Sequence, residues 1–161
     1  MKSLPVRLTA VLALGAASLL DLSARPAYAG LGATTASIEP DRASMKGQLR
    51  SRSAAGYSVE EITTPSGLVR EYVSPAGVVF AVSWNGSSMP NLRQAFGAYF
   101  SQFQAAVRAR RAQQPAFRGH DHLELHTSSL VVHAMGHMRQ YFGLAYVPAL
   151  VPANVSISDL H

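Results

Sequence analysis

The sequence contains no cysteine among its 161 residues, and only 14% of them are Asp, Glu, Lys or Arg. The absence of cysteine excludes disulfide bonds, thiol catalysis and cysteine-based zinc sites, so packing alone must hold the fold. The chain also lacks three motifs of common hydrolases, namely Gly-x-Ser-x-Gly, Ser-x-x-Lys and His-Glu-x-x-His. Because no motif names a reaction, we assign no catalytic residue.

The first 29 residues have the three-part pattern of a secretory signal peptide. Lys2 and Arg7 form a short basic start, an uncharged, mainly apolar run of 13 residues covers Leu8–Leu20, and Ala27-Tyr28-Ala29 provides a small-residue cleavage site. The run is short for a bilayer, which takes roughly 20 apolar residues, and no later segment is apolar for long enough. We therefore predict a signal peptide over 1–29 and export of the remaining chain to the periplasm or the cell exterior.

Removing the predicted signal peptide changes the charge of the protein. It leaves 11 Lys and Arg against 8 Asp and Glu, a net charge of +3 instead of +5. A charge of +3 on about 132 residues is modest, so we expect no nucleic-acid partner. That length is enough for one domain with its own core.

The first half of the remaining chain predicts a small helix followed by strands. Residues 30–37 are small and polar and suggest a flexible lead-in, and 38–49 has a thin apolar stripe that predicts a short helix. Between Tyr57 and Trp84, two Ser/Thr-Pro-x-Gly turns separate β-branched and aromatic segments. This pattern predicts a three-stranded antiparallel meander.

The second half predicts one long helix and two to three further strands. Apolar residues recur at three- and four-residue steps from Pro90 to Ala112, as on one face of a helix. Strands are expected from His120, over Leu130–Ala134 and over His137–Val147. We therefore predict a single α+β domain over 38–150, an antiparallel sheet with the helix packed on one face, and a polar C-terminal tail over 151–161.

All six histidines lie from residue 120 onward. Alternate residues of a strand point to the same face, so His120, His122 and His126 would share a face with Glu124 between them. His133 and His137 could join them from a neighbouring strand. Such a set could bind zinc, copper or nickel, and we take His120, His122 and His126 as candidate ligands of a divalent transition metal. The alternative is a solvated strand face that binds no cofactor.

The end of the long helix carries a cluster of four arginines: Arg108, Arg110, Arg111 and Arg118. Cations near a helix C-terminus are favoured by the helix dipole, which is sufficient reason for their presence. The functional alternative is contact with an anionic surface, such as lipid headgroups or an acidic cell-wall polymer.

Several segments resemble a known family of small exported proteobacterial proteins, domain of unknown function 2844. The similar segments are Ala36–Arg42, Tyr57–Ile62, Val69–Trp84, Pro90–Gln94 and Gly136–Arg139. The block from Arg70 to Trp84 is the most specific of them. The resemblance implies an exported protein of a Gram-negative bacterium, and it implies no activity and no catalytic residue.

These observations favour a non-enzymatic exported binding or accessory module. Two other hypotheses stay open, a metal-binding protein or metalloenzyme that uses the histidines and an envelope-associated protein that docks through the arginines. The sequence identifies no partner; for an exported accessory module, a periplasmic or envelope protein is one option.

Overall fold

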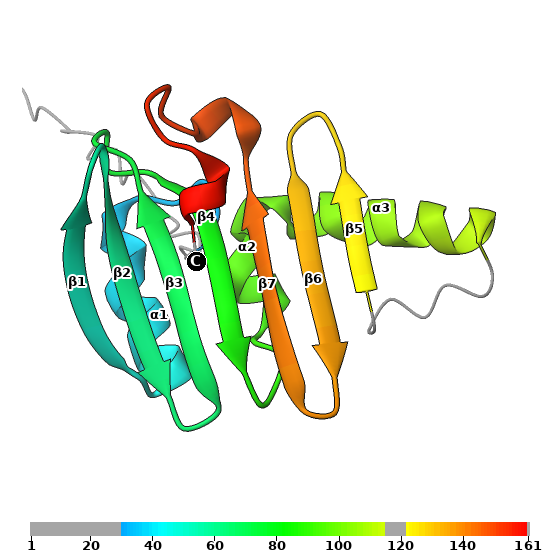
Figure 1. The fold of residues 1–161 in the computed structure, drawn as a ribbon, viewed down its shortest axis with the longest axis horizontal. Coiled ribbons are helices and arrows are strands. Elements are labelled where there is room, and N and C mark those ends of the chain that lie inside the picture. Colours follow the sequence, from blue (N-terminus) through cyan, green and yellow to red (C-terminus); the bar gives the residue numbers. More distant parts are fainter. Residues whose placement is uncertain (1–29, 115–121, 161) are drawn as a thin grey trace, which may run out of the picture.

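The computed structural model describes residues 30–114 and 122–160. Within them, seven strands form one antiparallel sheet, which confirms the predicted α+β class (Figure 1). The strands lie in the order β1-β2-β3-β4-β7-β6-β5. Their bounds are β1 (Gln48–Ala54), β2 (Tyr57–Thr64), β3 (Gly67–Val73), β4 (Val79–Gly86), β5 (His122–His126), β6 (Val131–His137) and β7 (Gln140–Tyr146).

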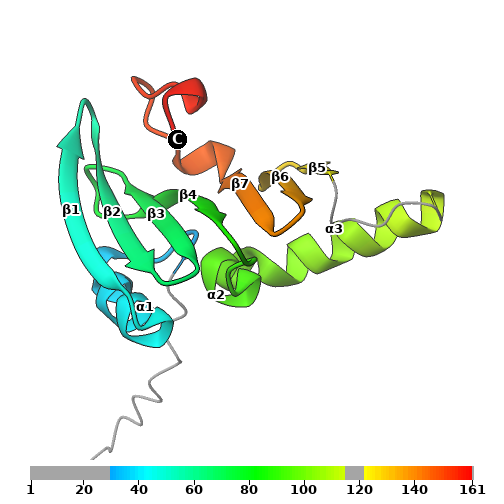
Figure 2. The same cartoon turned by 60° about the horizontal axis from the view of Figure 1, so that its bottom comes forward.

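The helices lie on one face of this sheet, as predicted (Figure 2). They are α1 (Ile38–Met45), α2 (Leu92–Phe96) and α3 (Phe100–Gln113), with the short 3-10 helices η1 (Thr35–Ser37) and η2 (Gly97–Tyr99). Two further 3-10 helices, η3 (Pro148–Leu150) and η4 (Ile157–Asp159), follow β7, and Ile157 of η4 packs on the opposite face. The helical run from 92 to 113 is interrupted at Gly97, which has a φ of 49° and ends α2. Of the two helices on either side of this break, α2 buries Ala95 and Phe96 fully, whereas no residue of α3 is fully buried.

The first meander has four strands, one more than the sequence predicted. The helix expected over 38–49 ends at Met45, because Lys46 adopts a left-handed conformation with a φ of 53°. The chain then enters β1, which pairs over its whole length with β2. Most of β1 is exposed at the edge of the sheet, and its polar sequence, Gln48–Ala54, lacks the apolar alternation that marks a half-buried strand.

The segment 30–37, expected as a flexible lead-in, packs against the domain. The Leu31 side chain is only 1% exposed, and its N–H donates to the carbonyl of Ala95 at 3.0 Å. Gly32 donates to the carbonyl of Val79 at 2.9 Å, and Thr34 forms a β-bridge with Val78. One buried leucine and these backbone bonds join the segment to β4 and α2.

The sheet is packed on both of its faces, by different parts of the chain. On the helix face, Trp84 and Phe96 lie in the larger core. On the opposite face, a smaller core around Tyr72 and Phe80 is closed by the C-terminal segment, where Leu160 is buried. Residues 151–160, expected as a polar tail, thus cover part of this face (Figure 2).

Gly143 of β7 leaves room for the single tryptophan of the chain. It pairs with Trp84 of β4, and a Cβ built there would lie 2.4 Å from the Trp84 ring and 2.7 Å from the carbonyl of His133. We expect Gly143→Ala to lower the free energy of unfolding by about 1–3 kcal/mol, since overpacking forces neighbours to shift. Urea denaturation measures this cost. It should shrink in a Trp84→Phe background, and an unchanged midpoint in the single variant would contradict the close packing.

Candidate metal centre

On the sheet face opposite the helices, the side chains of β5 and the parts of β6 and β7 around Met135 and Phe142 are exposed. Every second residue of β5 points to this face, namely His122, Glu124 and His126, and all three are exposed. Leu123 and Leu125 between them are buried in the core on the helix side. The half-buried strand expected from the sequence is therefore confirmed over 122–126. Its polar side chains face outward, and its two leucines are packed in the core.

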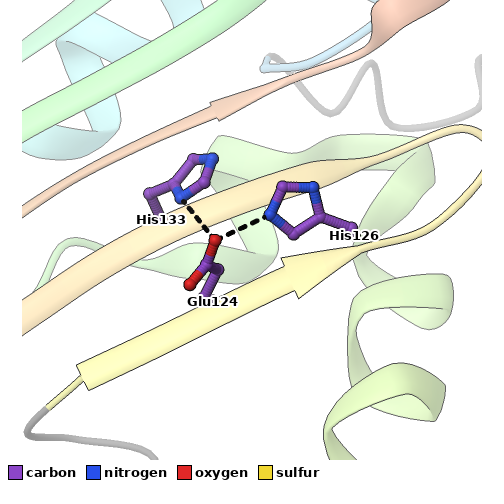
Figure 3. A group of neighbouring side chains, drawn as sticks. All are labelled: Glu124, His126 and His133. Carbon is purple, nitrogen blue, oxygen red and sulfur yellow. Dashed lines mark hydrogen bonds and ion pairs between the residues drawn. The ribbon is translucent and has the colours of Figure 1, made fainter.

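Three side chains of this face converge on one point. The antiparallel register places Glu124 of β5 opposite His133 of β6. Glu124 Oε1 lies 3.0 Å from His126 Nε2 and 3.9 Å from His133 Nδ1 (Figure 3). One donor atom of each residue lies within 4.8 Å of the others. We call Glu124, His126 and His133 the Glu-His-His cluster.

The Glu-His-His cluster has the chemistry of a metal site. Imidazole nitrogen and carboxylate oxygen are ligands of zinc, copper and nickel, and donor atoms within 4.8 Å of one another are close enough to share one ion after small side-chain movements. The two imidazole rings are nearly perpendicular, with centroids 5.1 Å apart. The hydrogen bond with His126, followed by the charge of the neighbouring histidines, lowers the pKa of Glu124, so this carboxylate stays ionised at neutral pH.

The candidate ligands predicted from the sequence are only partly represented in this cluster. His126 belongs to it, and His122 lies at its margin, with Nε2 3.8 Å from Glu124 Oε2. His120 lies outside the described residues. His133 comes close because it lies directly opposite Glu124, and directly opposed residues of neighbouring strands have Cβ atoms about 4.5–5.5 Å apart.

A groove of about 400 Å³ adjoins the cluster on the same face. His122, His133 and Leu160 are among the residues that line it. Its remaining lining includes Met135 and Phe142, which are 44% and 46% exposed. The cluster therefore borders a mixed polar and apolar surface that the C-terminal segment leaves uncovered.

The predicted arginine cluster is divided by the structure. Arg108 and Arg111 are exposed on α3. Arg110 instead reaches β5, where its Nη1 donates to the backbone carbonyl of Glu124. Arg118 lies outside the described residues. Arg110 thus supports the strand that carries the Glu-His-His cluster, and contact of the arginines with an anionic surface stays a prediction.

A buried pair of carboxyl groups, Asp41 and Glu71, lies elsewhere, between α1 and β3. Glu71 is 0% exposed and Asp41 2%, and they form a hydrogen bond with each other. No hydrogen-bond donor of the described residues, other than a proton on the pair, reaches the Glu71 oxygens. Burial, reinforced by Asp41, raises the pKa of Glu71 to about 9. Gln94 of α2 donates to Asp41 Oδ1.

The Asp41–Glu71 pair could have been suspected from one signal in the sequence. Glu71 alternates with Val69 and Val73, which both point into the core. A carboxyl group in an apolar register needs a buried partner. Asp41 is separated from it by thirty residues, so the partner itself could not be identified. Because the pair is sealed from solvent, we assign it a structural role.

The fold and the cluster define a class, a small α+β protein with an exposed imidazole and carboxylate site on an antiparallel sheet. Among residues 30–114 and 122–160, no helix has the length and apolarity needed to cross a membrane. The family described as Protein of unknown function (DUF2844) matches residues 27–160, and the chain belongs to this family. No curated protein and no solved structure is significantly similar to the chain.

Proposed function

We propose that the protein is an exported, non-enzymatic binding module whose ligand is a divalent transition-metal ion. The observation that carries the proposal is the convergence of Glu124, His126 and His133 from two paired strands. One carboxylate and two imidazoles would hold the ion, and the negative charge of Glu124 would favour a cation over a neutral ligand. Further positions of the ion would be filled by His122 or by water.

The surroundings of the cluster favour reversible binding. The side chains of His126, Glu124 and His133 are 57%, 47% and 44% exposed, so an ion can enter directly from solvent. Structural zinc sites, by contrast, are closed by four protein ligands. Buried Leu123 and Leu125 fix β5, and buried Val132 and Ala134 fix β6, which keeps the donors in place without metal. These features suit a protein that takes up and releases an ion.

Export is the second part of the proposal and rests on the N-terminal pattern of residues 1–29. Its test is cell fractionation of the full-length protein followed by mass spectrometry of the N-terminus. Recovery from the periplasm or the medium as a chain that begins near Gly30 supports export. An intact Met1 in the cytoplasmic fraction overturns it without affecting the metal site.

The metal site is tested by titrating metal-free protein, without an affinity tag, with Zn²⁺ and Cu²⁺. We expect His126→Ala/His133→Ala to weaken binding by more than ~10-fold, since even loss of an outer-shell partner has effects of that size. Isothermal titration calorimetry measures the affinities. The two side chains are 57% and 44% exposed and lie outside the core, so the circular dichroism spectrum should not change.

The matched control is His137→Ala. His137 is an exposed histidine of the same strand as His133, and it lies outside the Glu-His-His cluster. This variant should keep the affinity of the parent. The proposal is wrong if the parent protein binds neither ion, or if the control loses as much affinity as the double variant.

A further inference from the structure

The residue that faces His122 across the sheet is a methionine. The register of β5 and β6 pairs His122 directly with Met135, which places their Cβ atoms about 4.5–5.5 Å apart. Met135 also lies two positions from His133 on β6, so the two side chains share a face. His122, His133 and Met135 all line the groove beside the Glu-His-His cluster.

Met135 is accessible to an ion on this face. Its side chain is 44% exposed, whereas its neighbours Ala134 and Gly136 are buried. Methionine is among the residue types most often found inside proteins. Because it lies opposite His122 and two positions from His133, it gives the groove a thioether sulfur next to a nitrogen and oxygen site.

The two ends of this surface differ in ligand softness. Glu124 and His126 supply hard and borderline donors, while Met135 supplies a soft one. His133 lies close to Glu124, and it points to the same face of β6 as Met135. Thioethers select Cu(I), imidazole binds copper in both oxidation states, and zinc gains little from a thioether. Because the chain has no cysteine, methionine is its only source of sulfur ligands.

We infer that the metal of this site is copper and that Met135 supplies a thioether ligand to Cu(I), together with His122 and His133. This inference rests on the proposed metal-binding function and adds the identity of the ion. Cu(II) would be held by the Glu-His-His cluster, and His133 would be common to both ligand sets. An exported site built from methionine and histidine would also avoid the disulfide formation that threatens thiols in an oxidising compartment.

The test uses untagged, metal-free protein and the variant Met135→Leu, which conserves volume and removes the sulfur. Cu(I) affinity is measured without oxygen by competition with bicinchoninate, and Zn²⁺ affinity by competition with a chromophoric chelator. We expect Met135→Leu to weaken Cu(I) binding by at least ~10-fold and to leave Zn²⁺ binding unchanged. X-ray absorption of the Cu(I) form should show a copper–sulfur distance that the variant lacks.

Met138→Leu is the matched control, because Met138 is an exposed methionine, 85% accessible, that follows β6 and does not line the groove. It should bind Cu(I) like the parent. The inference is wrong if the protein binds copper without a copper–sulfur contact, or if Met135→Leu loses as much affinity for Zn²⁺ as for Cu(I). Either result leaves the proposed function standing. A parent protein that binds no metal at all overturns the proposed function.

Discussion

Replacing Glu71 by glutamine should stabilise the protein, and the gain should grow as the pH rises. In the folded state the pKa of Glu71 is raised from 4.5 to about 9, mainly by burial. Between these values the folded chain holds a proton that the unfolded chain has released. The free energy of unfolding of the parent should therefore fall by about 1.4 kcal/mol per pH unit from this group, a loss that glutamine removes.

Glutamine is the appropriate substitution because its amide can still donate a hydrogen bond to Asp41, as the protonated carboxyl does. Asp41 keeps its second donor, Gln94. Urea denaturation at pH 5, 7 and 9 gives the slopes. Parallel pH profiles of the parent and Glu71→Gln would show that the carboxyl is ionised in the folded state, against the expectation.

Glu39→Gln is the control for this experiment. Glu39 lies on α1, as Asp41 does, but it is exposed and paired with Arg42 at 2.7 Å. The hydrogen bond and charge of Arg42 lower the pKa of Glu39, so its contribution to stability is lost only as the pH falls through the acid range. The alkaline slope of this variant should match that of the parent.

Removal of residues 151–161 should destabilise the protein more than any single substitution outside the main core. The segment covers Val59, Tyr72 and Phe80, each of which is 0% exposed in its presence. Replacing one buried leucine by alanine costs about 2–5 kcal/mol, and we expect a cost in this range for Leu160→Ala. The deletion should exceed it, because Val155 and Ile157 leave the same core.

Thermal and urea unfolding followed by circular dichroism measure both effects. Ser158→Ala is the matched control in the same segment, since Ser158 is exposed and its hydrogen bonds within the described residues are to its neighbours Ser156 and Asp159. It should change stability by less than ~0.5 kcal/mol. A deletion variant as stable as the parent would mean that the segment does not belong to the core.

The parts of the fold that could be predicted are those with strong local signals. The turns at Thr64–Gly67 and Ser74–Gly77 separate β2, β3 and β4, and each strand is rich in β-branched or aromatic residues. β1 has no such signal because it is an exposed edge strand, stabilised by pairing with β2. The packing of the C-terminal segment on the sheet could not be predicted either, since its few apolar residues, such as Leu160, are separated by polar ones.

The candidate site could likewise be predicted only in part. Alternation along β5 places Glu124 and His126 on one face, and the sequence suffices for that step. The position of His133 opposite Glu124 depends on the register of β5 and β6, which the sequence did not specify. The pairing of Asp41 with Glu71 depends on how α1 packs on the sheet, which is a tertiary contact.

The position of β7 in the sheet has a consequence for the order of assembly. β7 is the last strand of the chain, yet it lies between β4 and β6 and is the sole strand connection between the two halves of the sheet described here. Until Gln140–Tyr146 is available, one edge of β4 has no partner, although six residues of that strand, Val79–Trp84, become buried. When the chain emerges N-terminus first, the centre of the sheet therefore stays incomplete until β7 has emerged. Pairing of β7 with β4 is a long-range contact, and such contacts form slowly. Under the proposed export, delayed closure of this kind would leave the chain incompletely folded while it crosses a membrane. It also leaves the unpaired backbone edge of β4 exposed to pairing with other chains until β7 forms.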